Sequence, residues 1–420
     1  MDRRFVSLFT IVLIDLIGFT IVIPVLQLYA EERFGAGDVQ ATMLIAAFSV
    51  AQFVFAPVLG RLSDAFGRRP VLIVSQIGTM LGFLVLGFAN SLFLLYLGRV
   101  IDGISGGNIT TAQAYVNDIT TEENRARGFG IISAAFGSGF VIGPLLSGVV
   151  VKVAQLIPAI APYSQNAPFF VASVFSLGSI LGTYFLLPES LPMENRSPLN
   201  QGKATNDVGL MEMLSNDGVR LILTFAAMTF LGFSLFHTSF SLVVARNVFT
   251  GMDLEDTQFS IGLLLAWLGF LIVLVQGFAV GPLVKRFGER RLVMLGALLR
   301  IPTFVAIALA HSPWVIVAAF VPLALGNGVS QPSLQSIISR YAPPTMRGRV
   351  LGTFQSTASL MLVFGPLFSG VLLAEVGTAA PDLAAAGLLA VAFLLSFQIL
   401  RLALPSQEGS PAQVEMAPAG

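Results

Sequence analysis

The stretch GRLSDAFGRR at residues 60–69 decides the fold, because the chain contains a second version of it. The second version, GPLVKRFGER, occupies residues 281–290 and begins 221 positions after the first. Two further pairs are 222 positions apart: RARGFG at 125–130 with RGRVLG at 347–352, and GPLLSG at 143–148 with GPLFSG at 365–370. Three matched sites at nearly one spacing predict two related halves that share one orientation.

Long apolar runs surround these repeats. A helix that crosses the hydrocarbon core of a bilayer needs about 20 mostly apolar residues. Runs of that kind occur at residues 5–29, 41–61, 71–89, 92–116, 128–151, 168–187, 219–244, 258–283, 292–310, 314–338, 350–373 and 383–403. The sequence therefore predicts an all-α integral membrane protein with twelve transmembrane helices in two pseudo-symmetric six-helix bundles. The expected parts are an N-terminal bundle (1–187), a cytoplasmic linker (188–218), a C-terminal bundle (219–403) and a disordered cytoplasmic tail (404–420).

The composition agrees with this architecture. Of the 420 residues, 55% are hydrophobic and only 11% are charged, less than half of the roughly 25% in soluble domains. This excludes a soluble enzyme. The 23 basic residues balance the 23 acidic ones, so nothing favours binding to nucleic acid. The chain has no cysteine, two histidines and no clustered catalytic groups, so we expect neither a metal site nor enzymatic activity.

Lysine and arginine are distributed unequally between the two sides of the predicted membrane. If the N-terminus is cytoplasmic, 18 of the 23 basic residues lie in cytoplasmic segments, three lie on the opposite side and two lie within helices. Cytoplasmic loops of membrane proteins carry the excess of positive charge. Because an even number of crossings returns the chain to its starting side, both termini are predicted to be cytoplasmic.

The motifs resemble those of the major facilitator superfamily along nearly the whole chain. Residues 60–69 match its signature between helices 2 and 3, LGRVIDG at 97–103 is similar to its helix-4 motif, and GFVIGPLLSG at 139–148 is similar to the helix-5 motif of antiporters. DLIGFTIVIP at 15–24 resembles the drug:proton antiporter branch, notably tetracycline exporters. The resemblance implies a proton-coupled exporter of small amphipathic or drug-like solutes that works by alternating access. It further implies a monomer in a bacterial inner membrane, with the proton gradient as its energy source and no cofactor.

One departure from that branch concerns acidic residues inside the membrane. Tetracycline exporters, as the resemblance implies, carry carboxylates in helices 3 and 9. Here the predicted helix 3 has none, and helix 9 carries Arg300 instead. The resemblance therefore does not assign tetracycline as the substrate, and Arg300 either snorkels to the membrane surface or takes the place of the missing acid.

Three ionisable residues in predicted helices are candidates for proton coupling. Asp15 lies about ten residues into helix 1, where an ionised carboxylate costs roughly 3 kcal/mol. Because burial favours the protonated form, we expect Asp15 to take up and release a proton; a structural hydrogen bond is the alternative. Arg99 and Asp102 stand at i, i+3 and share a helix face. The resemblance implies that Arg99 modulates the proton-binding acid or the substrate pocket, whereas a self-neutralising pair would serve only insertion and packing.

The candidates for substrate binding lie in predicted helices 4, 7, 10 and 11. Three amides of helix 10 are spaced at i, i+4 and i+8, and lipid would penalise them without partners, so this stripe faces the bundle or a cavity. The resemblance implies that the stripe contacts substrate, and hydrogen bonds between helices are the alternative. Phenylalanines of helix 7 suit an apolar or planar ligand, although packing explains the same pattern. The candidates are Asn108, Gln113, Phe233, Phe236, His237, Phe240, Asn327, Gln331, Gln335 and Gln355.

The repeated motifs supply candidates for gating. In residues 139–148, glycines permit close helix contact and a proline bends the helix, so we expect a tight contact between the halves that limits proton leak. The resemblance implies that Asp64 docks on the start of helix 11 and holds the cytoplasmic side closed; surface charge complementarity without gating is the alternative. Lys285 replaces this acid in the second copy, which makes the lock one-sided. The candidates are Gly60, Asp64, Gly67, Arg68, Gly139, Gly143, Pro144, Arg347 and Arg349.

Two other functions fit the same architecture. One is a proton-linked uptake symporter for a small metabolite, and the other is a non-transporting membrane receptor with this fold. The Gly-Pro motif of helix 5 favours export.

Overall fold

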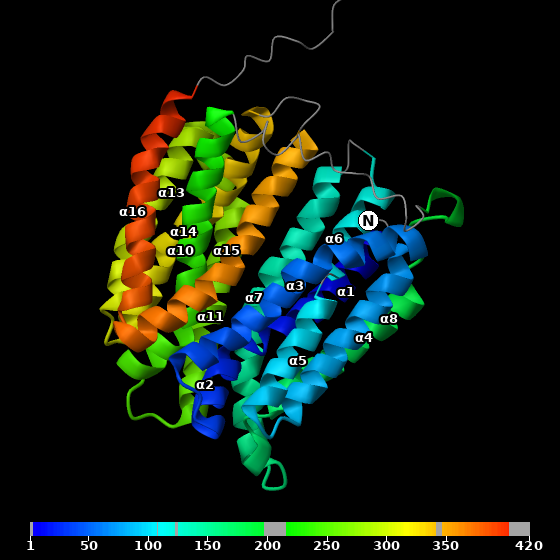
Figure 1. Cartoon of the computed structure of the whole chain (residues 1–420), viewed down its shortest axis with the longest axis vertical. Helices are drawn as coiled ribbons and strands as arrows, with labels where there is room; N and C mark the ends of the chain where they lie inside the picture. The colour runs from blue at the N-terminus through cyan, green and yellow to red at the C-terminus, as the bar shows by residue number, and fades with distance from the viewer. Residues whose placement is uncertain (1–2, 107, 122–124, 197–215, 342–346, 403–420) are drawn as a thin grey trace, which may run out of the picture.

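The computed structural model describes residues 3–106, 108–121, 125–196, 216–341 and 347–402. Within these ranges the chain folds into helices joined by short connections, and the helices form two bundles that lie side by side (Figure 1). The N-terminal bundle is drawn from blue through cyan to the green of α8, and the C-terminal bundle from lighter green through yellow to red. The all-α membrane fold predicted from the sequence is confirmed.

The N-terminal bundle crosses the membrane with both continuous and divided helices. α1 and α2 form one crossing and α5 and α6 another, whereas each other crossing is a single helix. The bounds are α1 (Arg3–Thr20), α2 (Ile23–Phe34), α3 (Asp38–Phe66), α4 (Arg68–Gly87), α5 (Leu92–Ser105), α6 (Asn108–Ile119), α7 (Arg125–Leu156) and α8 (Ala167–Leu186).

The C-terminal bundle repeats this plan, and one of its crossings contains a π-helix between two α-helices. A π-helix is a rare element that is found mostly as a short insertion at functional sites. The bounds are α10 (Asp217–Asn247), α11 (Leu254–Leu274), the π-helix (Val275–Ala279), α12 (Val280–Phe287), α13 (Glu289–Ala308), α14 (Pro313–Tyr341), α15 (Arg347–Glu375) and α16 (Ala380–Arg401).

The predicted fourth helix is interrupted. Eleven segments of the described chain are long and apolar enough to cross a membrane by themselves. The remaining crossing consists of α5 and α6, with 14 and 12 residues, which are separated at Gly106 and the undescribed residue 107. Glycine weakens a helix, and the Gln52 amide of α3 donates a hydrogen bond to the Gly106 carbonyl at 2.8 Å. A side chain therefore satisfies a backbone group at the break.

α1 begins and α16 ends at the same end of the bundles, the upper end in Figure 1. We call it the terminal end, and it carries the helix ends at residues 3, 66, 287 and 401. The opposite end, which we call the distal end, carries the helix ends at residues 34, 156, 247 and 375.

Candidate functional site

The two bundles meet along two helix pairs, α7 with α11 and α3 with α15. We call this contact the seam. In its distal part Gly148 packs against Phe259, and Gly370 packs against Val39. Ala41 of α3 is fully buried in one apolar cluster with side chains of α10, α11 and α14. The bundles are therefore closed against each other at the distal end.

Glycines of α11 allow the backbones of α7 and α11 to touch. A methyl group on Gly262 would lie 2.4 Å from the Pro144 carbonyl oxygen, and one on Gly269 would lie 2.9 Å from the Phe140 carbonyl oxygen. Because Pro144 has no amide hydrogen, the Phe140 carbonyl lacks its helical donor. That carbonyl faces Gly269, whose Cα–H group can make a weak hydrogen bond. The proline and the opposing glycine thus stabilise the seam together.

The glycines predicted to gate in α7 face a different neighbour. A methyl group on Gly139 would lie 2.8 Å from Leu16 Cβ, and one on Gly143 would overlap the Thr20 hydroxyl. The Thr20 hydroxyl also lies 2.8 Å from the Gly139 carbonyl oxygen. The expected tight contact of these two glycines is therefore made with α1 inside the N-terminal bundle. One residue turns a helix by about 100°, so the adjacent residues of α7 face α11 instead.

The same glycine contacts occur in both halves of the internal repeat. Gly365 of α15 packs against Ser234 of α10, just as Gly143 packs against the first crossing of its own bundle. Gly370 and Gly148 then both face the other bundle. The repeated Gly-Pro motif thus joins each helix to its own bundle on one face and to the seam on the other.

Ion pairs across the seam reinforce the distal closure. Arg246 of α10 lies 2.7 Å from Glu31 and also pairs with Asp38 of α3. Lys152 of α7 pairs with Asp256 of α11. These side chains remain partly exposed, and exposed pairs typically contribute about 0–1 kcal/mol each. They bias the distal end towards closure without fixing it.

The same helices are uncovered near the terminal end. Among the described residues, a methyl group on any of four glycines near this end would meet no atom within 4 Å; these are Gly60 of α3, Gly130 of α7, Gly281 of α12 and Gly352 of α15. α12, which follows the π-helix, has no buried residue. The conformation is therefore closed distally and uncovered at the terminal end.

Polar amides lie on exposed faces of the C-terminal bundle. Gln331 and Gln335 of α14 and Gln355 of α15 are exposed, and Asn327 is partly buried. Lipid would leave exposed amides without hydrogen-bond partners, so these side chains fit an aqueous opening between the bundles. The predicted stripe on α14 is thus a continuous polar face.

The helix-4 candidates lie on α6. Gln113 is partly buried, and the side chain of Asn108 is outside the described residues. No role in binding follows from either position.

The aromatic candidates of α10 divide into two groups. Phe236 and Phe240 are each 1% exposed and pack against Phe320 of α14, edge-on and tilted respectively, with ring centroids 6.3 and 5.5 Å away. They fill the core of the C-terminal bundle, because their helix face points towards α13 and α14, and they do not line an opening in this conformation. Phe233 and His237 are partly buried, with ring centroids 5.9 Å apart. Only these two remain available to a ligand.

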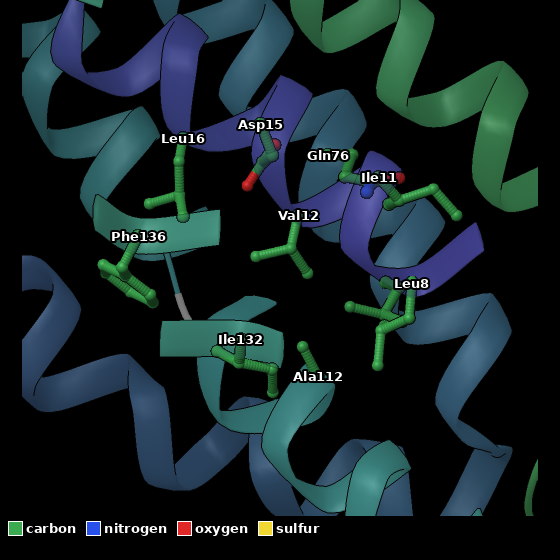
Figure 2. A pocket seen from close by; sticks show the side chains of 10 residues that line it. Leu8, Ile11, Val12, Asp15, Leu16, Gln76, Ala112, Ile132 and Phe136 are labelled. Atoms are coloured by element: carbon green, nitrogen blue, oxygen red, sulfur yellow. The ribbon is translucent and has the colours of Figure 1, made fainter. Parts of the chain in front are cut away.

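Asp15 borders a small cavity inside the N-terminal bundle (Figure 2). Apolar side chains of α1, α4, α6 and α7 line it, together with Asp15 and Gln76. Its volume is about 20 Å³, which is enough for one water molecule. Asp15 is partly buried, and Gln76 donates a hydrogen bond to Ser179 of α8 at 2.7 Å. The acid thus lies beside a space that can be hydrated, not on the seam.

Arg99 and Asp102 form the ion pair that their spacing predicts. Arg99 Nη1 lies 2.7 Å from Asp102 Oδ2, and the two residues are 4% and 2% exposed. The guanidinium also lies over the Phe48 ring of α3, 4.4 Å from its centroid. The pair neutralises its own charge and joins α5 to α3, which matches the packing alternative. Its part in proton coupling stays a prediction.

Gly67 and Arg68 hold the N-terminal bundle together at the terminal end. Gly67 has φ +102°, a conformation that favours glycine. Arg68 Nε donates to Asp118 of α6 at 2.9 Å, and its Nη1 donates to Asp64 at 2.5 Å. The backbone amide of Arg68 donates to Glu189 at 2.9 Å, which places a carboxylate at the start of α4. The motif thus connects α3, α4, α6 and the segment after α8.

Asp64 is therefore held by its own bundle in this conformation. The side chains of its predicted partners, Arg347 and Arg349, lie outside the described residues. The one-sided lock stays a prediction.

The second copy of the motif keeps this ion pair with reversed charges. Glu289 stands 221 positions after Arg68, and Arg340 stands 222 positions after Asp118. Glu289 accepts hydrogen bonds from Arg340 at 3.1 Å and from Ser336 at 2.6 Å. The repeat thus preserves the site of the contact while exchanging the partners.

Two buried ionisable residues were not assigned a role from the sequence. Asp382, the third residue of α16, is fully buried, and neither carboxylate oxygen has a hydrogen-bond partner among the described residues. It precedes the apolar run predicted at 383–403, and the prediction therefore placed it outside the membrane-spanning helix. Arg300 is 3% exposed and therefore does not snorkel. In the described parts of the chain, no group of three His, Asp or Glu side chains could hold a metal ion.

Comparisons with known proteins agree with this architecture. The model of the Major Facilitator Superfamily matches residues 8–255 and 248–419. The class C tetracycline resistance protein of Escherichia coli is 34% identical over 360 residues, which cover 85% of this chain and 86% of that protein. Multidrug resistance protein 2 of Bacillus subtilis is 28% identical over 375 residues, which cover 88% of each chain.

A solved structure supports the same assignment. The crystal structure of the human organic anion transporter MFSD10 has a TM-score of 0.67 and 26% identity, covering 94% of this chain and 99% of that one. Transporters of this family bind small molecules within the bilayer, and they are not enzymes. The chain therefore belongs to the Major Facilitator Superfamily, among its drug-exporter-like transporters.

Proposed function

We propose that this transporter exports small amphipathic or drug-like solutes in exchange for protons, by alternating access. The observation that carries the proposal is the asymmetry of the seam. Glycine contacts and ion pairs close its distal end, whereas four glycines at the terminal end face no neighbour within the described parts of the chain. Transporters built from two repeats rock their halves about a site between them. This conformation is the one that takes up solute from the terminal side.

The terminal end is proposed to face the cytoplasm of a bacterial cell, with the protein in the inner membrane. The 18 basic residues assigned to that side support this orientation. The bacterial tetracycline and multidrug resistance relatives support export. The protein is proposed to act as a monomer without a cofactor, driven by the proton gradient.

Asp15 is proposed to carry the proton. It borders a cavity with room for one water, which gives the carboxyl group a partner for proton exchange. Its neighbour Leu16 packs on Gly139 of α7, so movement at Asp15 is transmitted to a helix of the seam. Arg99 and Asp102 are proposed to modulate this acid.

The solute is proposed to bind along the polar face of α14 and beside the two accessible rings of α10. Gln331 and Gln335 offer hydrogen bonds, while Phe233 and His237 offer flat surfaces. Polar groups beside aromatic rings suit an amphipathic molecule.

Flux in proteoliposomes tests the proposal. Purified wild-type protein, Asp15→Asn and the control Asp217→Asn, an exposed acid at the start of α10, are reconstituted. Tetracycline and a lipophilic cationic dye serve as probes, and a trapped pH indicator reports proton movement. For wild type and the control we expect movement of a probe opposite to the proton flux. For Asp15→Asn we expect probe movement that no longer responds to the imposed gradient.

The same measurement separates the alternatives. Probe and proton movement in one direction would identify an uptake symporter, and binding without flux would identify a receptor. Gradient-driven export that persists in Asp15→Asn would refute the assignment of the proton site.

A further inference from the structure

Arg300 is a buried cation that has no carboxylate partner among the residues that the structure describes. It lies at the middle of α13 and is 3% exposed. Its Nε donates to the Gly296 carbonyl of its own helix at 2.9 Å, and its Nη1 donates to Asn327 Oδ1 of α14 at 3.0 Å. Its Nη2 is buried and has no hydrogen-bond partner in the described part of the chain. The guanidinium therefore keeps unused donors inside the C-terminal bundle.

The contrast with Arg99 shows that this arrangement is unusual within the molecule. Arg99 has the Asp102 carboxylate at 2.7 Å, whereas no described carboxylate oxygen lies within 4.0 Å of Arg300. A charged group inside the membrane is costly unless it is paired, and unpaired ones mark functional sites. The site thus lacks one negative charge.

Asn327 connects this cation to the polar face of α14. Its Oδ1 accepts from Arg300, so its Nδ2 group is the end left to contact other molecules. Asn327 is partly exposed and stands four residues before the exposed Gln331, on the same face of the helix. Asn327 therefore brings hydrogen-bond donors to this face, and the positive charge of Arg300 lies buried directly behind it.

Small residues make room for the arginine between the two helices. A methyl group on Gly326 would lie 2.8 Å from Arg300 Cγ, and one on Gly296 would lie 2.7 Å from the Gly326 carbonyl oxygen. The side chain thus lies flat between α13 and α14, with its head at Asn327. The absence of side chains at Gly296 and Gly326 thus leaves space for the arginine side chain between α13 and α14.

We propose that Arg300 and Asn327 form a binding site for a carboxylate group of the transported solute. This inference rests on the proposed function and names a substrate class for it: amphipathic organic anions. A carboxylate that enters along the α14 face accepts from Asn327 Nδ2 and supplies the missing charge to Arg300. Arginine suits this role because its planar head can donate two parallel hydrogen bonds to a carboxylate.

Equilibrium binding to the purified full-length protein tests the site without requiring transport. The probes are dansyl-phenylalanine, which carries a carboxylate, and its primary amide, which has nearly the same shape without the charge. Wild-type protein is expected to bind the acid at least tenfold more tightly than the amide. Arg300→Gln is expected to remove this preference while the affinity for the amide changes less than twofold. The control Arg401→Gln, at an exposed arginine of α16, should retain the preference.

A second variant keeps the test decisive if Arg300→Gln does not fold. Asn327→Asp places a carboxylate beside Arg300, preserves the size of the side chain and should lower acid binding at least tenfold through competition and repulsion. Equal binding of the acid and the amide by the wild type would overturn the proposal. An equal loss of both ligands in Asn327→Asp would also overturn it, because a merely structural role predicts that result.

The outcome is separable from that of the proposed function. If the site is correct and proton coupling is not, acid-selective binding persists although no gradient drives flux. If coupling is correct and the site is not, Arg300→Gln still exchanges the cationic dye for protons while the wild type shows no preference for the acid.

Discussion

Replacing Arg246 with glutamine should shift the balance between the two ends of the transporter. Arg246 contacts Glu31 and Asp38 across the seam, and the three side chains are 35%, 21% and 17% exposed. Pairs of this exposure contribute about 0.2–1 kcal/mol each, so losing both costs the closed distal end about 1 kcal/mol. Since 1.4 kcal/mol corresponds to a factor of ten, the ratio of distally open to closed molecules should rise about fivefold.

Cysteine labelling measures this shift, because the chain contains no cysteine of its own. Ala41→Cys places a thiol on α3 at a position that is fully buried against the C-terminal bundle. A membrane-impermeant maleimide added from the distal side should react about fivefold faster when Arg246→Gln is also present. Arg246→Lys retains the charge, so the labelling rate with this variant should lie between the rates with Arg246 and with Arg246→Gln. Because salt screens exposed pairs, the difference should shrink in 1 M salt.

Ala385→Cys provides the matched control, because Ala385 is equally buried but lies on α16 within the C-terminal bundle. Its labelling rate should not change. Unchanged labelling at Ala41→Cys would show that the Arg246 contacts do not bias the distal end. A parallel increase at Ala385→Cys would show general loosening of the fold instead.

Three further predictions concern the ion pairs and the uncovered glycines. Asp102→Ala should lower the free energy of unfolding, measured by thermal unfolding in detergent, by about 3–5 kcal/mol, because it leaves a buried guanidinium unpaired. Adding Arg99→Met should restore most of this stability. Equal stability of the single variant and the double variant would contradict this reasoning. Gly352→Leu should leave the melting temperature unchanged but reduce flux at least tenfold by obstructing closure of the terminal end, whereas Gly387→Leu, which also meets no atom within 4 Å, lies on α16 away from the seam and should transport normally. Glu289→Arg should lower the free energy of unfolding by about 0.2–1 kcal/mol in thermal unfolding. Replacing Arg340, the α14 arginine that Glu289 contacts, with aspartate in the same chain should restore this stability. A double variant less stable than Glu289→Arg alone would refute the reversed-charge pairing.

Much of the fold follows from properties that act locally along the chain. Hydrophobic length fixed the number of crossings, and the matched motifs revealed the two bundles. The interruption between α5 and α6 was not predicted, because a glycine inside an apolar run is compatible with a continuous helix. At the break a different helix supplies the hydrogen bond, because the Gln52 amide donates to the Gly106 carbonyl, and sequence spacing does not reveal such a contact.

The candidate site was harder to predict because it depends on which helix faces which. The sequence identified Gly139 and Gly143 as close-contact residues but could not indicate that they face α1 while Phe140 and Pro144 face α11. One residue turns the helix by about 100°, and this turn decides whether a residue of α7 faces α1 or α11. Arg300 was conspicuous in the sequence, yet only packing could reveal that it is buried without a carboxylate beside it.

The position of α7 has a mechanical consequence. On one face of α7, Gly139 packs against Leu16 of α1. The next residue, Phe140, contacts Gly269 of α11 in the opposite bundle. A single helix therefore separates the segment of α1 that contains Asp15 from the seam. If Asp15 carries the proton as proposed, a shift of α7 alone would be enough to connect its protonation to the contact between the bundles.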